Sequence, residues 1–214
     1  MLEALFAKPP TVKAVNTLAL VRAADGYVDL ANKKAITKYY TPTISGVASK
    51  FDNASFLFNS GYIGVGAASE FVWTKTDDFT VEWWQYVTQF NDNNWFLAKG
   101  TGSTSCLKTY LSNLYLQTEN NGSTYVATTS ALTLNVWQHV ALVQSGGTLK
   151  VYVNGVQKMT MTALGNFGLT SIPISWGGGN SGYTARAYMD QLRISGIARY
   201  ISPFTPPTQK FEVD

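Results

Sequence analysis

The chain alternates short runs of β-branched and aromatic residues with short stretches rich in glycine, asparagine and aspartate. Residues 78–84 read DFTVEWW, residues 137–143 read WQHVALV, and residues 149–155 read LKVYVNG. Residues of these types suit a pleated, half-buried surface, so each run predicts a β-strand.

The connections between these runs predict hairpins. Gly146 and Gly147 separate the second run from the third, and the third ends in Asn154 and Gly155. An Asn-Gly pair is a strong short-range indication of a two-residue hairpin turn, because both residues tolerate positive φ. We therefore expect a three-stranded meander, whose apolar face needs a second layer to cover it.

Strand patterns and turn residues continue through the rest of the chain, giving about a dozen short strands with turns every 8–12 residues. Only residues 67–71 and 197–200 could form a helical turn. Neither a repeat nor a linker interrupts the pattern. The fold class predicted is all-β, a two-sheet antiparallel β-sandwich filling one domain over residues 17–214.

Residues 1–16 differ from this pattern and are predicted to form a separate N-terminal arm. Leu2, Leu5 and Phe6 could form one apolar turn before Pro9 and Pro10 stop any helix. Such an arm is either a frayed terminus or a peptide that docks on a partner, and these alternatives stay open.

Composition narrows the classes of function. Only 14% of the residues are charged, the net charge is +3, and no basic run exceeds two lysines, which argues against nucleic-acid binding. No apolar run is long enough to span a bilayer, and the first residues lack the features of a secretion signal. Six Trp and twelve Tyr among many amides and hydroxyls suit neutral partners such as glycans. The single cysteine, Cys106, rules out an internal disulfide.

Several segments resemble laminin-G-like, concanavalin A-like jelly rolls. Residues 78–84 are similar to the segment "dFTiEfW" of that family, residues 137–141 to "W-x-HVA", and residues 149–155 to "lklYvNG". Residues 188–208 resemble the closing pattern "yIDelRIs…vARYt…FTPPT", which is common in variants from bacteriophage tail and virion proteins. Ala187 and Gln191 depart from it, since the family favours Gly and an acidic residue there.

The residues needed for catalysis are mostly missing. His139 is the only histidine and lies in the middle of a predicted strand, so a structural role is expected for it. Glycosidases of this fold place paired carboxylates on one strand face, whereas Glu82 stands alone between aromatic residues. Structural zinc is excluded, since the chain offers one imidazole and one thiol.

Calcium is the one cofactor that the resemblance implies, and no cofactor is expected to be required. The candidate ligands are Asp92 and Asn94, in a polar loop, together with Asp190. The alternative is a solvated polar turn, and the amide at Gln191 weakens any calcium site inherited near Asp190.

Ligand contacts are expected from aromatic rings beside amide-rich loops, because a sugar has an apolar face and a polar edge. The candidates are Trp95, Tyr125, Trp176, Tyr183 and Asn180, and each ring is also suited to core or rim packing.

The resemblance implies a non-enzymatic structural or adsorption protein of a virion, assembled in the host cytoplasm. Its arm would dock on other virion proteins, its loops would bind a cell-surface glycan or a neighbouring protein, and it could form a homo-oligomer in the assembly. A free-standing carbohydrate-binding lectin is the alternative, and a glycoside hydrolase is a third class.

Overall fold

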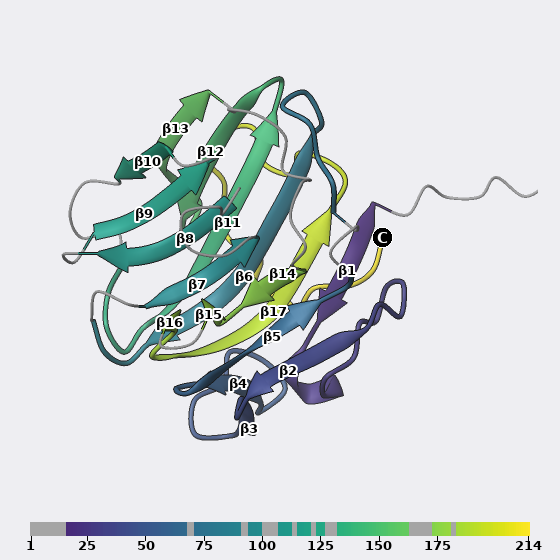
Figure 1. Ribbon diagram of the computed structural model, residues 1–214, viewed down its shortest axis with the longest axis vertical. Helices are drawn as coiled ribbons and strands as arrows, with labels where there is room; N and C mark the ends of the chain where they lie inside the picture. The colour runs from purple at the N-terminus through teal and green to yellow at the C-terminus, as the bar shows by residue number, and fades with distance from the viewer. Residues whose placement is uncertain are drawn as a thin grey trace, which may run out of the picture.

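The computed structural model describes residues 16–67, 71–90, 94–99, 107–112, 115–120, 123–126, 132–162, 173–180 and 183–214. Two antiparallel sheets lie over one another (Figure 1), which confirms the predicted all-β sandwich. In these ranges the single helical element is one 3-10 turn, η1 (Ala23–Asp25), and residues 197–200 are not helical. No described helix is long and apolar enough to cross a membrane.

The first sheet has eight strands, which are β1 (Thr17–Val21), β3 (Thr43–Ser45), β4 (Ser55–Phe58), β6 (Phe79–Val87), β11 (Trp137–Ser145), β12 (Thr148–Val153), β13 (Val156–Thr162) and β17 (Ala187–Ser195). Their order is β13-β12-β11-β6-β17-β4-β3, and β1 pairs with β17 outside this path.

The second sheet has seven strands, which are β2 (Ile36–Tyr40), β5 (Gly61–Val65), β7 (Trp95–Lys99), β8 (Leu107–Ser112), β9 (Tyr115–Asn120), β10 (Ser123–Val126) and β14 (Ile174–Trp176). Their order is β10-β9-β8-β7-β14-β5-β2. The short strands β15 (Gly178–Asn180) and β16 (Tyr183–Thr184) pair with each other as a separate hairpin.

The predicted meander is strands β11, β12 and β13. Gly146 and Gly147 have φ of 54° and 75°, and Asn154 and Gly155 have φ of 50° and 75°. Both turns therefore use the positive φ values expected of two-residue hairpins, and the strands that they join pair antiparallel.

The core lies between the two sheets and follows the two-residue alternation of the strands. In β6, Val81 and Trp83 are fully buried in the main apolar cluster, and Ile63 and Val65 of β5 meet them from the other sheet. Residues that alternate with these, such as Glu82, face the outer side of the eight-stranded sheet.

The segment after β17, residues 196–214, crosses that outer side and covers part of it. Tyr200 and Phe204 stack with ring centroids 3.6 Å apart and pack on Tyr152, and Phe211 packs on Trp84. The backbone carbonyl of Asp214 accepts hydrogen bonds from the N–H groups of Asn16 and Thr17, at 2.6 and 3.1 Å. We call residues 196–214 the C-terminal strap.

Candidate functional site

The outer side of the seven-stranded sheet carries a cluster of tyrosines. Tyr62 lies between the inward-facing Ile63 and the turn before β5, so its ring lies on the outer face. Tyr39 on β2 is directly opposite Tyr62, and the two rings stack with centroids 4.6 Å apart and planes 13° from parallel.

Tyr40 joins the same cluster because its backbone leaves the strand conformation. Consecutive residues of a regular strand point to opposite faces, but Tyr40 has a φ of 58°. Its ring lies 6.3 Å from that of Tyr62, and 62% of the side chain is exposed. A large exposed ring held in uncommon backbone geometry is a feature that packing of the core does not explain.

Glycines bring the β15–β16 hairpin against this sheet. A Cβ at Gly178 would lie 3.0 Å from the Cβ of Tyr62, and one at Gly179 would lie 2.7 Å from the ring of Trp95. A Cβ at Gly178 would also lie 2.7 Å from the carbonyl oxygen of Tyr183, so a side chain at either position would push the hairpin away from these rings.

Trp95 and Tyr183 form a second pair of rings at the same hairpin. Their centroids are 4.7 Å apart at 28°, so the buried Trp95 supports Tyr183, which is 38% exposed. We call Tyr39, Tyr40, Tyr62, Trp95 and Tyr183 together the aromatic face.

The chemistry of the aromatic face is that of neutral, amphipathic rings. Burial raises the pKa of Tyr62 above its ordinary value, and the neighbouring Tyr39 and Tyr40 raise it further. The Tyr62 hydroxyl therefore stays protonated at neutral pH and can both donate and accept a hydrogen bond. Rings that offer an apolar face and a polar tip are the groups that sugars stack on and bond to.

A buried ionic cluster lies on the other sheet, beneath the strap. Both carboxylate oxygens of Glu82 are occupied. Oε1 accepts from Arg193 Nε at 2.9 Å, and Oε2 accepts from Tyr200 at 2.8 Å and lies 2.9 Å from His139 Nε2. Burial alone raises the pKa of Glu82, but the hydrogen bond from His139 and the charge of Arg193 outweigh it and hold that pKa below its ordinary value. Arg199 Nε lies 3.8 Å from Oε1, so four groups surround one acid, and the buried, hydrogen-bonded ring of His139 has the structural role predicted for it.

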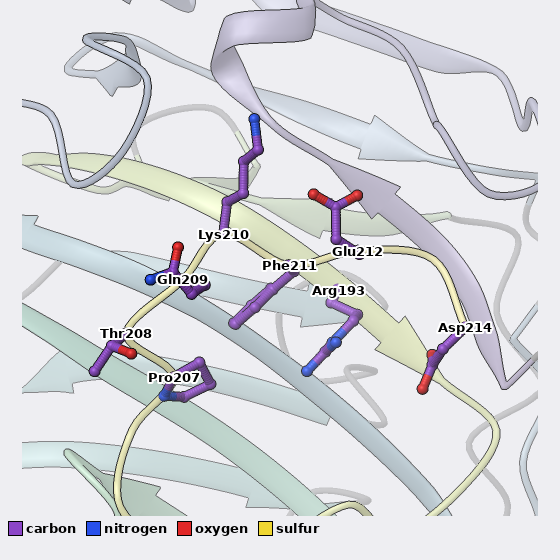
Figure 2. Close-up of a pocket in the computed structure, with 8 residues that line it drawn as sticks. All are labelled: Arg193, Pro207, Thr208, Gln209, Lys210, Phe211, Glu212 and Asp214. Atoms are coloured by element: carbon purple, nitrogen blue, oxygen red, sulfur yellow. The ribbon is translucent and has the colours of Figure 1, made fainter.

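A pocket of about 390 Å³ opens between the strap and Arg193 (Figure 2). Its charged side chains already have partners. Arg193 pairs with Glu82, Lys210 with Asp52, Glu212 with Arg22 and Asp214 with Arg199. In Figure 2 the side chains of Lys210 and Glu212 point away from Arg193. This pocket therefore offers no free charge to a ligand.

The predicted ligand residues separate in the structure. Trp95 and Tyr183 come together, and Asn180 is the β-ladder partner of Tyr183. Trp176 is fully buried against Phe56 and Phe58, so its ring belongs to the core and does not reach the surface. Tyr125 lies on the edge strand β10, across the sheet from the tyrosines.

The predicted metal ligands do not converge in the described part of the chain. Asn94 is buried, and its side-chain amide donates to the carbonyl of Gln89 at 2.6 Å. Asp190 is buried as well, accepting from the N–H of Ala23 at 3.0 Å and from Gln191 at 3.2 Å, and burial raises its pKa to about 6. Asp92 lies outside the described residues. Within them, no three His, Cys, Asp or Glu residues are grouped as a metal site.

The proposed docking residues Leu2, Leu5 and Phe6, and Cys106, also lie outside the described residues. The arm and its boundary at residue 16 therefore stay predictions.

Comparison with protein families matches residues 59–200 to the laminin-G-type model of the concanavalin A-like lectin/glucanases superfamily. The chain belongs to this superfamily. Comparison with curated protein sequences gives no match.

Solved members of this fold include binding domains from larger proteins. Domain 4 of AbnA, an extracellular arabinanase from Geobacillus stearothermophilus solved with arabinotriose, superposes with a TM-score of 0.67 at 17% identity, covering 87% of this chain and 95% of that one. The binding domain of Paraclostridial Mosquitocidal Protein 1 gives 0.67 at 16% identity, with 86% and 49% covered. A structure from work on ganglioside-dependent cell entry of botulinum neurotoxin type C gives 0.60 at 13%, with 86% and 48% covered. The chain spans about half the length of these last two structures.

Sequence reasoning missed Tyr39, Tyr40 and Tyr62 as site residues. Tyr39 and Tyr40 lie on β2, an edge strand with mostly exposed side chains, which lacks the apolar alternation that identifies strands. Tyr62 lies on the buried strand β5, where nothing in the sequence set it apart from core residues. The adjacent Tyr39 and Tyr40 were the one indication of a surface site in the sequence, since two neighbouring tyrosines in a polar segment are not expected to pack into the core.

Proposed function

We propose that this sandwich is a non-enzymatic glycan-binding module and that its aromatic face makes the contacts. The observation that carries the proposal is the exposure of Tyr40 and Tyr183, each in a group of packed rings, on the two sides of the β15–β16 hairpin. Exposed rings that the fold holds rigidly are suited to binding, because little side-chain entropy remains to be lost.

The structural relatives support a ligand of this class. Domain 4 of the arabinanase was solved with arabinotriose, and cell entry of botulinum neurotoxin type C depends on interaction with two ganglioside molecules. The identities are low, so the proposal depends on the rings of this chain, and the relatives add only that the same fold is used for sugars.

The arrangement of the acids supports the absence of catalysis. Retaining and inverting glycosidases need two carboxyl groups roughly 5–10 Å apart, one protonated and one free to act. Glu82 is held by two arginines, a histidine and a tyrosine, and Asp190 is hydrogen-bonded to Ala23 and Gln191.

Binding of the full chain to arabinotriose and to an array of neutral oligosaccharides tests the proposal. An aromatic contact contributes about 0.5–1.5 kcal/mol beyond its buried area, so the double variant Tyr39→Ala, Tyr40→Ala should weaken binding roughly tenfold or more. The matched control is Ile201→Ala, which removes an equally exposed apolar side chain from the strap. Absence of binding to every saccharide, or binding unchanged in the double variant, would refute the proposal.

We place the module in a virion, as a structural or adsorption protein whose N-terminal arm docks on a neighbouring component. The support is the closing sequence at residues 188–208 and the apolar Leu2, Leu5 and Phe6 ahead of the sandwich. Deletion of residues 1–16 should leave a folded, glycan-binding domain that is lost from purified particles. Unchanged incorporation of the truncated protein into particles would contradict the docking role.

A further inference from the structure

A row of partly exposed side chains crosses the outer side of the eight-stranded sheet. Trp137 on β11, Tyr86 on β6, Tyr188 on β17 and Leu57 on β4 are successive partners in the strand register. All four are partly exposed. The Tyr86 ring lies 5.8 Å from that of Trp137 and 6.0 Å from that of Tyr188, so the row is continuous across adjacent strands.

This row ends at a pocket of about 300 Å³. Tyr188 and Leu57 line it together with Phe58, Asn59, Thr88, Arg186 and Ala187. The Arg186 guanidinium is held over the turn after β4, because its Nη1 donates to the carbonyl oxygen and to the side-chain oxygen of Asn59. Among the described residues that line the pocket, Arg186 is the only charged one.

The pairing of Arg186 differs from that of the other arginines. The chain has four arginines, and Arg22, Arg193 and Arg199 each pair with a carboxylate. In the part of the chain that the structure describes, Arg186 contacts two neutral oxygens and forms no ion pair. A guanidinium has five N–H donors in a planar fork, so this one keeps donors that can bind an anion.

We propose that the Arg186 pocket is a second binding subsite, specific for a sugar that carries a carboxylate. The carboxylate would pair with Arg186, and the sugar ring and its neighbours would lie along Tyr188, Tyr86 and Trp137. This deepens the proposed function, since it takes glycan binding as given and adds an acidic ligand at a separate face.

The charge of the pocket favours a carboxylate over a phosphate. A phosphate monoester carries about −1.5 to −2 at neutral pH, whereas a carboxylate carries a single charge that one guanidinium balances. No further cation lines the described pocket.

The position of the row favours a sugar over an acidic peptide. Peptides that bind sheets usually add a strand at an exposed edge, where backbone groups are free. Strands β11, β6, β17 and β4 are interior strands of their sheet, and their backbone groups are used in its ladders. Ring faces and side-chain hydroxyls remain, and these suit a saccharide.

The test is calorimetric titration of the full chain with two matched pairs of probes. The pairs are trigalacturonate with its methyl triester, and 3′-sialyllactose with lactose. We expect at least one acidic member to bind roughly 10-fold or more tightly than its neutral counterpart, because a hydrogen bond to a charged group is worth about 1.5–3 kcal/mol. Equal binding of the two members in both pairs, including no binding of either, would overturn the proposal.

Variants test whether Arg186 is responsible for the preference for the acidic sugar. Arg186→Gln should abolish it, Arg186→Lys should keep part of it, and Lys158→Gln, on an exposed position of the edge strand β13, should leave it unchanged. Unfolding temperatures confirm that the variants are folded. A preference that survives Arg186→Gln refutes the site, and equal Arg186-dependent binding of tetraglutamate refutes the sugar assignment.

The two proposals fail separately. The double variant Tyr39→Ala, Tyr40→Ala should lose affinity for neutral saccharides while the acidic preference remains. If that variant also loses the preference, the two faces are not independent sites and the second subsite is wrong.

Discussion

Replacing Glu82 by Gln should be among the most destabilising conservative changes in this sandwich. The substitution keeps the shape of the side chain but removes the only carboxylate that contacts Arg193 among the described residues. Both carboxylate oxygens lie in a fully buried side chain and accept from Arg193, His139 and Tyr200. Removing one partner of a buried ionic contact leaves an uncompensated charge and costs about 3–5 kcal/mol.

Urea unfolding followed by tryptophan fluorescence measures this loss. The matched control is Glu212→Gln, which breaks an ion pair with Arg22 whose glutamate side chain is 69% exposed. An exposed pair is worth about 0–1 kcal/mol, so the two variants should differ by roughly 2 kcal/mol or more. Because the pKa of Glu82 is lowered in the folded protein, its contribution is present at neutral pH and is lost as the pH falls through that pKa. Equal losses for the two variants would refute the reasoning.

Three further outcomes are expected. The pKa of Asp190 is raised to about 6, so the folded protein loses stability as the pH rises through that value. Relative to the wild type, the free energy of unfolding of Asp190→Asn should therefore increase by up to about 3 kcal/mol between pH 4 and pH 7, as measured by parallel urea titrations. A constant difference would contradict the raised pKa. Gly155→Ala should lower the unfolding temperature far more than Gly146→Ala, because both have positive φ but only the first would drive a Cβ into the carbonyl of Phe204. Equal decreases in unfolding temperature would show that the strap moves to make room for the added methyl group, which would contradict the prediction. Phe211→Ala removes a buried ring from the strap and should cost about 3–5 kcal/mol in chemical unfolding, and a loss below about 1 kcal/mol would mean that the strap is not packed there.

The fold could largely be predicted from the sequence, because short local segments specify its turns and buried strands. Asn154 and Gly155 specify their own turn, and the runs in β6, β11 and β12 carry enough apolar residues to identify buried strands. Strands β2 and β3 were missed, since their side chains are mostly exposed and give no alternating pattern.

The sites were harder to predict from the sequence, because their contacts join residues that are far apart along the chain. The partners of Glu82 lie 57, 111 and 118 positions away, so nothing near it indicated that it was buried and paired. Trp176 precedes a glycine-rich stretch and was therefore a candidate ligand residue, but it lies on an interior strand whose inner face is the core.

Gln191 stands where the family pattern favours an acidic residue, and the structure gives its amide a role. Its φ of 59° lies in a bulge of β17, where its amide donates to Asp190 and its carbonyl accepts from the N–H of Phe211. An acidic residue could not donate to Asp190, so the amide suits this position.

The contact of Asn16 and Thr17 with Asp214 has a mechanical consequence. A pulling force applied at Asn16 and Asp214 acts on two neighbouring points of the sandwich. These points are joined by two backbone hydrogen bonds, and Asp214 is also held by its ion pair with Arg199. We expect these contacts to carry such a load before the sheets do.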